Sequence, residues 1–114
     1  MASLRLELFD VVVVPFPFTD RASTKRRPAI VISTGTFNKA QSNSVLAMIT
    51  SAEQSEWLGD CPISDLKAAG LINDCVIRLK LFTLDHRLII RKAGTLSSAD
   101  QKQLKTKWKG LLLS

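Results

Sequence analysis

The sequence predicts a small, mainly β protein with a C-terminal α-helix. Short runs of apolar and β-branched residues recur along the chain, polar loops separate them, and only the last segment takes a helical period. Several short strands within 114 residues favour a curled antiparallel sheet, and a compact barrel with a terminal helix is its natural architecture. Because no linker or internal repeat interrupts the pattern, we expect one domain over residues 1–114.

The N-terminal half predicts three strands. Four consecutive valines at residues 11–14 indicate a buried strand, which Pro15 and Pro17 should stop because neither can donate a backbone hydrogen bond. Residues 20–26 are polar and charged, which is typical of an exposed loop. The remaining expectations are a strand at 28–33 with Pro28 in its first position, a turn or short helix at 35–43, and a strand at 44–50.

The C-terminal half predicts short strands followed by the helix. A polar loop at 51–60 precedes expected strands at 61–64, 75–80 and 86–91. Ser97 and Asp100 then resemble a capping box at the start of a helix. The apolar residues that follow recur at i, i+4, i+7 and i+8 and predict one apolar stripe, which consists of Leu104, Trp108, Leu111 and Leu112.

Charge and composition narrow the class of protein. The formal net charge is +6, and residues 61–114 alone sum to +6, which favours a polyanionic partner, although lysines that only aid solubility give the same balance. The N-terminus does not resemble a signal peptide, and the longest apolar run, residues 11–18, is too short to span a bilayer. We therefore expect a soluble, cytoplasmic protein without a membrane partner.

Few residues are available for histidine or metal chemistry. Cys61 and Cys75 are too few for a zinc site without carboxylates, and we expect reduced thiols rather than a disulfide. The one histidine, His86, is expected to be structural or exposed. Motifs for nucleotide, metal or cofactor binding do not occur, so no cofactor or metal is expected. Any catalysis should use arginine, threonine, serine, lysine or carboxylates.

These side chains suit the cleavage of RNA, whose own 2′-OH can attack the adjacent phosphorus. The protein must then position the strand, move a proton and stabilise the phosphorane, and arginine grips phosphate oxygens well. Arg27 precedes the second expected strand and Thr50 ends the third. If these strands pair as antiparallel neighbours, Arg27 and Thr50 lie at the same edge of the sheet, with the loops 20–26 and 51–60 around them. From the residues alone, this pair is a suggestion.

The chain resembles the MazF/PemK (Kid) toxins in four ordered segments. These are FDVVVVPFPFTD, KRRPAIVIS, LAMITS and VIRLKLFTLDHRLI, and the likeness extends over roughly residues 8–100. One departure is Phe9, which stands before Asp10 where the family usually has glycine. A second is the short loop before Arg27, which lacks glycine; both bear on cleavage specificity.

The resemblance implies an SH3-like barrel, a homodimer and metal-independent, sequence-selective cleavage of single-stranded RNA. Products with a 2′,3′-cyclic phosphate and a 5′-OH would follow. The catalytic arginine and threonine of the family match Arg27 and Thr50. The resemblance implies that Arg27 acts as proton donor/acceptor and phosphate clamp, and that Thr50 assists at the phosphorane. The RNA-binding residues that the resemblance suggests are Lys25, Arg26, Ser51, Trp57, Arg78 and Lys80. For Trp57, a packing role fits at least as well.

The resemblance also implies a partner, an antitoxin whose acidic, apolar tail lies across the RNA groove. Two alternatives remain open at this point. One is a CcdB-like barrel toxin that binds a protein target such as gyrase, and the other is an RNA-binding barrel without catalytic activity.

Overall fold

Six strands and three α-helices make up the described part of the protein. The computed structural model describes residues 4–16, 25–53 and 56–112. In chain order the elements are β1 (Asp10–Phe16), β2 (Lys25–Val31), α1 (Gly35–Gln41), β3 (Asn43–Ser51), β4 (Cys61–Pro62), α2 (Leu66–Ala69), β5 (Cys75–Asp85), the 3₁₀ turn η1 (His86–Leu88), β6 (Arg91–Thr95) and α3 (Ser98–Trp108). The prediction of a mainly β protein with a C-terminal helix is confirmed.

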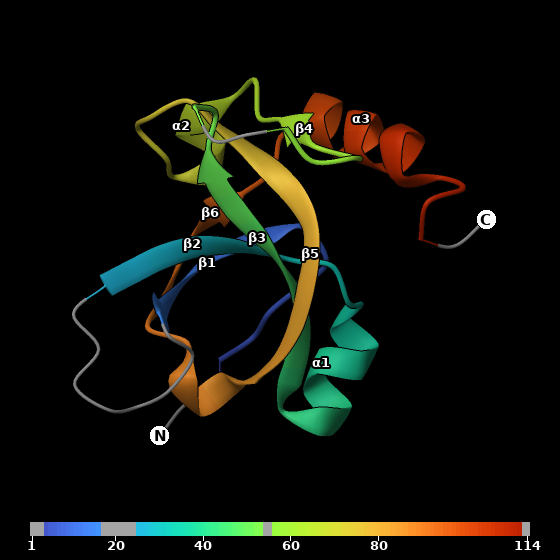
Figure 1. Ribbon diagram of the computed structural model, residues 1–114. Coiled ribbons are helices and arrows are strands. Elements are labelled where there is room, and N and C mark those ends of the chain that lie inside the picture. The colour runs from blue at the N-terminus through green and yellow to red at the C-terminus, as the bar shows by residue number, and fades with distance from the viewer. Residues whose placement is uncertain (1–3, 17–24, 54–55, 113–114) are drawn as a thin grey trace.

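The strands form one antiparallel sheet in the order β4-β5-β3-β2-β1-β6. The sheet curls into a half-barrel, with α2 and α3 at one end and α1 at the other (Figure 1). Within the described residues, no helix has the length and apolar character needed to cross a bilayer.

Both faces of the central strands are buried, which is why β1 is a continuous apolar run rather than an alternating one. One apolar cluster contains Val11 and Ile30 and packs against α3 through Leu104 and Trp108. The other cluster lies on the opposite face of the sheet. Its buried members are Leu6, Val12, Val14, Ala29, Val31, Leu46, Leu84 and Ile89.

The expectation that Pro15 stops the first strand is wrong, because β1 continues to Phe16 and Pro15 is paired with Arg26. The carbonyl of Val13 accepts a hydrogen bond from the N–H of Ile90, so the peptide groups of Val13 and, two residues later, Pro15 are directed away from β2. The β1–β6 pairing ends at Val13. Pro15 therefore removes no hydrogen bond from the sheet. Pro17 lies outside the described residues.

Pro28 has the opposite orientation and does end a ladder. The N–H of Ile32 donates to the carbonyl of Val45 at 2.9 Å. Because peptide groups alternate in direction along a strand, those of Ile30 and Pro28 also point towards β3. Pro28 has no N–H to donate. The β2–β3 pairing accordingly stops at Ala29, which is paired with Met48. Pro28 is the fourth residue of β2 rather than the first residue of a strand, and this corrects the sequence-based expectation.

Several other boundaries differ from the expectation. Lys25 and Arg26 belong to β2 and not to the loop 20–26, whose residues 20–24 lie outside the described part of the chain. The expected strand at 86–91 is wrong: β5 extends to Asp85, whose carboxylate accepts from the N–H of Arg87 and caps the turn η1. The expected strand at 61–64 is reduced to two residues. The strand at 44–50 and the short helix within 35–43 are confirmed.

The terminal helix is shorter than its apolar stripe suggested. It ends at Trp108, and Gly110 then takes a φ of 84°, a left-handed conformation that terminates helices. Leu104 and Trp108 are buried, whereas Leu111 and Leu112 lie beyond the helix and are 40% and 45% exposed. The prediction that these two leucines continue the stripe is therefore wrong.

Phe9 adopts a backbone conformation that glycine takes more readily, with a φ of 76°. Its N–H donates to the carbonyl of Val31, and its carbonyl accepts a hydrogen bond from the N–H of Leu96. Its side chain is buried in the cluster of α3, and the ammonium of Lys105 lies 5.4 Å from the ring centroid. The buried ring compensates for the strain of its backbone.

Asp100 joins the start of α3 to the segment between β4 and α2. The Asp100 side chain is buried, and it accepts hydrogen bonds from the backbone N–H groups of Ser64 and Asp65 and, in 2.6 Å, from the Ser64 hydroxyl. Burial raises the pKa of Asp100, but the hydrogen bonds from Ser64, Asp65 and Ser97 outweigh it and leave the pKa below its ordinary value. The carboxylate is therefore stabilised in its charged form.

We predict that Asp100→Asn lowers the free energy of unfolding by about 2–3 kcal/mol, because an amide cannot accept all of these hydrogen bonds. Urea denaturation measures the loss. Since the folded pKa of Asp100 is depressed, its contribution is present at neutral pH and is lost as the pH falls through the folded pKa. Asp85→Asn, on an exposed ion pair with Arg87, is the control and should cost less than about 1 kcal/mol. An equal loss in both variants would contradict this role.

Candidate functional site

A groove opens where β2 and β3 separate beyond Pro28. Its volume is about 990 Å³. It is lined by residues 26–28 of β2, residues 49–53 at the end of β3, residues 70–75 between α2 and β5, and Val13, Arg91 and Ala93. We refer to this set as the β2–β3 groove. Strand residues and loops from five parts of the chain thus meet around one opening.

Arg27 and Thr50 both line this groove. The last β2–β3 pair is Ala29 with Met48, and Arg27 and Thr50 each lie two residues further along their strands, where side chains return to the same face of the sheet. By the same alternation, both side chains belong to the face of the sheet that carries Ala29. The guanidinium carbon of Arg27 lies 5.2 Å from the centroid of the Phe16 ring, which restricts the arginine through a cation–π contact. Both residues that the sequence pairs are therefore part of the lining of one groove.

Arg26 and Ser51 also line the groove, next to Arg27 and Thr50. The Ser51 hydroxyl accepts a hydrogen bond from the N–H of Glu53 and so shapes the turn after β3. Lys25 is exposed at the first residue of β2, before the residues that line the groove.

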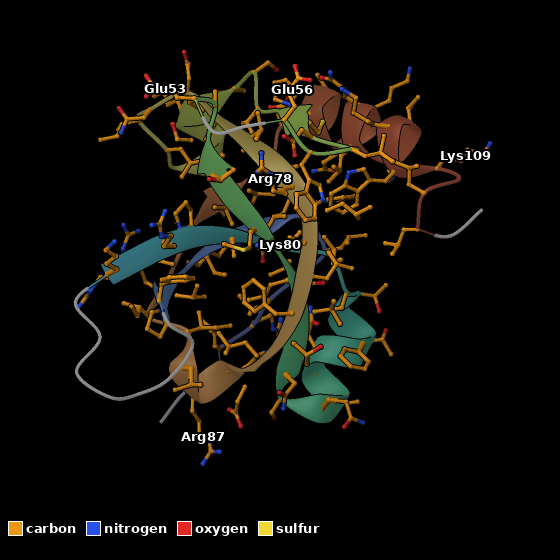
Figure 2. The ribbon with its side chains drawn as sticks, viewed as in Figure 1. Glu53, Glu56, Arg78, Lys80, Arg87 and Lys109 are labelled. Carbon is orange, nitrogen blue, oxygen red and sulfur yellow. The ribbon has the colours of Figure 1, made fainter. Side chains whose placement is uncertain are left out.

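Trp57, Arg78 and Lys80 form a second group, centred on β5. The guanidinium of Arg78 and the ammonium of Lys80 lie 5.7 Å and 5.5 Å from the indole of Trp57. The indole N–H donates to the carbonyl of Leu79 in 3.3 Å, and 47% of the tryptophan remains exposed. Arg78 is paired with Met48 and hence belongs to the same face of the sheet as Arg27 and Thr50. Figure 2 shows Arg78 and Lys80 along β5, beside β3.

Arg78 is held by Asp60, a residue that the sequence analysis did not single out. Two nitrogens of the guanidinium contact the two carboxylate oxygens at 3.1 Å and 2.9 Å, and the two side chains are only 12% and 18% exposed. This bidentate pair lowers the pKa of Asp60 through the hydrogen bond from Arg78. The charge of Arg78 is therefore largely balanced within the protein.

Residues 70–75, which form one wall of the β2–β3 groove, were also not predicted from the sequence. Nothing in the local sequence shows that this segment reaches β3. Gly70 ends α2 with a φ of 75°, and a Cβ there would lie 2.1 Å from the carbonyl oxygen of Ala93 in β6. A Cβ on Gly94 would lie 2.4 Å from the carbonyl oxygen of Ala68. Two glycines thus allow α2 to contact β6 backbone to backbone, and this contact positions the wall.

The remaining candidate groups for chemistry are the thiols and His86. Cys61 and Cys75 are free, as expected, and burial raises the pKa of both, that of Cys75 to about 11. Nε2 of His86 lies 2.8 Å from the hydroxyl of Ser44, and His86 lines a separate pocket beside α1. Among the described residues, no three His, Cys, Asp or Glu side chains gather in a group that could hold a metal ion.

The family comparison covers most of the chain. Residues 7–112 match the model of the PemK-like, MazF-like toxins of type II toxin–antitoxin systems. The chain belongs to this family. No curated protein matches the toxin in sequence.

Solved structures share the fold of the toxin at low sequence identity. A MazE–MazF structure from Deinococcus radiodurans matches with a TM-score of 0.74 and 19% identity, over 97% of this chain and 100% of that chain. The Mycobacterium tuberculosis toxin MazF-mt6 matches with a TM-score of 0.71 and 16% identity, over 92% and 98%. An endoribonuclease in complex with its cognate antitoxin, from a mycobacterial species, matches with a TM-score of 0.71 and 14% identity, over 96% of both chains.

We predict that Cys75 of the folded toxin reacts slowly with iodoacetamide although it lines an open groove. With a pKa of about 11, its thiolate fraction at pH 8 is about 100-fold smaller than that of a thiol with the ordinary pKa of 9.0. The rate, measured by mass spectrometry in a Cys61→Ser variant, should rise about tenfold per pH unit up to roughly pH 10. The urea-unfolded variant is the control. A folded protein that reacts as fast as the unfolded one would contradict the assigned environment.

Proposed function

We propose that this toxin is an endoribonuclease that cuts single-stranded RNA at selected sequences without a metal ion. The observation that carries the proposal is that Arg27 and Thr50 both line the groove, just beyond the last pair of the β2–β3 ladder. The solved mycobacterial relative that is an endoribonuclease supports the same class of activity.

In the proposed reaction, the 2′-OH of one nucleotide attacks the adjacent phosphorus and the 5′-oxygen of the next nucleotide leaves. Arg27 binds two phosphate oxygens and balances the charge that builds on the phosphorane. The Thr50 hydroxyl donates to a non-bridging oxygen. The products carry a 2′,3′-cyclic phosphate and a 5′-OH. Because an unpaired strand can present its bases and riboses to side chains, the proposed substrate is single-stranded RNA.

Neighbouring residues have separate proposed roles. Arg26 and Lys25 lie beside Arg27 on β2 and would contact phosphates on one side of the cut. Ser51 would hydrogen-bond the same strand next to Thr50. The exposed part of Trp57 would stack on a base, with Lys80 beside it, while the Arg78–Asp60 pair holds the indole in place.

Partners follow from the same surface. We propose that an antitoxin with an acidic, apolar tail occupies the groove in place of RNA, since structures of relatives include MazE–MazF and a complex with a cognate antitoxin. We also propose that the toxin acts as a homodimer in the cytoplasm. Light scattering of the free protein measures its mass and so tests the homodimer.

We predict that the purified toxin cuts a long, unstructured transcript in EDTA, and that Arg27→Ala lowers the rate by at least about 100-fold. Thr50→Ala should lower it by about 10- to 100-fold, since one hydrogen bond to the phosphorane is lost. Sequencing of the new 5′ ends reports both the rate and the sequence that is cut.

The matched controls are Arg87→Ala and Thr83→Ala. Arg87 is 88% exposed and lies at the other end of the molecule from Glu53 of the groove (Figure 2), and Thr83 is an exposed threonine of β5. Both variants should retain the rate of the wild type. An Arg27→Ala protein as active as these controls would remove the assignment of Arg27.

A second prediction concerns Trp57. Because stacking of one base contributes about 1–3 kcal/mol, Trp57→Ala should raise the KM for a short RNA substrate by about tenfold or more and leave kcat nearly unchanged. Trp57→Phe, which keeps an aromatic face, should lie close to the wild type. Steady-state kinetics separate the two constants. A fall in kcat with unchanged KM would contradict a stacking role.

A further inference from the structure

The proposed cleavage needs a proton acceptor that the Arg27–Thr50 pair does not supply. The 2′-OH must lose its proton as it bonds to phosphorus, and an acceptor near that oxygen speeds the step. An arginine guanidinium stays protonated in proteins, and a threonine hydroxyl is a weak base. The pair can therefore bind and stabilise the phosphate, but another group should accept the proton.

The groove contains few groups that can do this at neutral pH. Arg26 and Arg91 are cations, and the Cys75 thiol, with a pKa of about 11, remains protonated. His86 lines the pocket beside α1 and not the groove. Among the described residues that line the groove, the carboxylates of Glu53 and Asp74 remain.

The register of β3 and β5 distinguishes these two carboxylates. Thr50 is paired with Val76, and Ser51 with Cys75. The N–H of Ala52 donates to the carbonyl of Asp74 at 3.2 Å, so Asp74 stays next to the chain that follows Thr50, one residue before β5 begins at Cys75. Two residues before Val76, Asp74 belongs to the same face of the sheet as Thr50 and is its diagonal neighbour.

Glu53 lacks this placement. It follows the last paired residues, and its N–H turns back to the hydroxyl of Ser51. Arg27, Thr50 and Asp74, in contrast, come from three neighbouring strands or their ends, with Thr50 in the middle. Diagonal neighbours in a sheet are roughly 7–8 Å apart at Cα, which leaves room for a ribose hydroxyl between the two side chains.

We propose that Asp74 is the general base of the cleavage, an inference that rests on the function proposed above. The Asp74 carboxylate accepts the 2′-OH proton while the O2′–P bond forms and the P–O5′ bond breaks. The leaving 5′-oxygen takes a proton from water, and Asp74 returns its own proton to solvent. No oxidant, metal or second substrate is needed, and the RNA atoms are divided between the cyclic phosphate and the 5′-OH product.

Charges around Asp74 suit this role. The groove carries three cations, Arg26, Arg27 and Arg91, and the two carboxylates. Asp74 is exposed at the end of the sheet, so its proton can exchange with water after each cut. Loss of its negative charge should not weaken the binding of a polyanion.

The test compares four proteins under single-turnover conditions: wild type, Asp74→Asn, Glu53→Gln and Arg27→Ala. Each cuts an oligonucleotide that contains the sequence found with the long transcript, between pH 4 and 8, with circular dichroism as a check of the fold. We expect Asp74→Asn to lower the maximal rate by about 100-fold or more with unchanged or tighter RNA binding. We also expect the fall in rate towards acid pH, seen in the wild type and in Glu53→Gln, to be absent from Asp74→Asn.

A further measurement separates a base from a structural residue. In Asp74→Ala the missing carboxylate leaves space, and added formate should restore part of the rate, whereas it should not restore Arg27→Ala. If the wild type cuts RNA and Asp74→Asn cuts equally well, the inference about Asp74 fails and the proposed function stands. A uniform loss over all pH values without rescue by formate overturns it as well. If the wild type does not cut RNA, the proposed function itself fails.

Discussion

One missing hydrogen-bond donor determines where the functional surface begins. Pro28 directs its nitrogen towards β3 but has no N–H, so the β2–β3 ladder stops at Ala29 and Met48 and the strands separate beyond them. Arg27 and Thr50 lie just beyond that last pair, and both line the groove. A residue with an N–H at this position would extend the ladder and bring the two strand ends together. The groove thus depends on a proline in a place that sheets normally avoid.

The surface on this side of the sheet carries cations that line the groove and a cation that forms an ion pair within the protein. Arg27 and Arg26 border the opening, whereas Arg78 is held by Asp60 and stands beside an indole. A count of basic residues would treat them alike. The structure separates them into cations that a polyanion can reach and a cation whose charge is balanced by Asp60, so the net charge of +6 comes from residues other than this pair.

The sequence predicts the class of fold from local patterns of apolar runs, and it pairs Arg27 with Thr50 only with the help of the family resemblance. It does not predict which side of a strand a proline nitrogen faces, and so the effects of Pro15 and Pro28 could not be told apart. Nor does it show that residues 70–75 reach β3, because β4 and α2 intervene in the chain. The capping of η1 by Asp85, which replaced an expected strand, depends on one side-chain hydrogen bond within an otherwise β-like run.

Phe9 couples the opening of α3 to that of the start of β1. Its left-handed backbone costs about 1–2 kcal/mol, which its ring recovers only while packed in the cluster that includes Leu104 and Trp108. Detachment of α3 would therefore also release the start of β1, through the backbone bonds from Phe9 to Val31 and from Leu96 to Phe9. Segments almost ninety positions apart along the chain should exchange their amide protons as one cooperative unit, independently of the outer end of β2, where Arg27 lies.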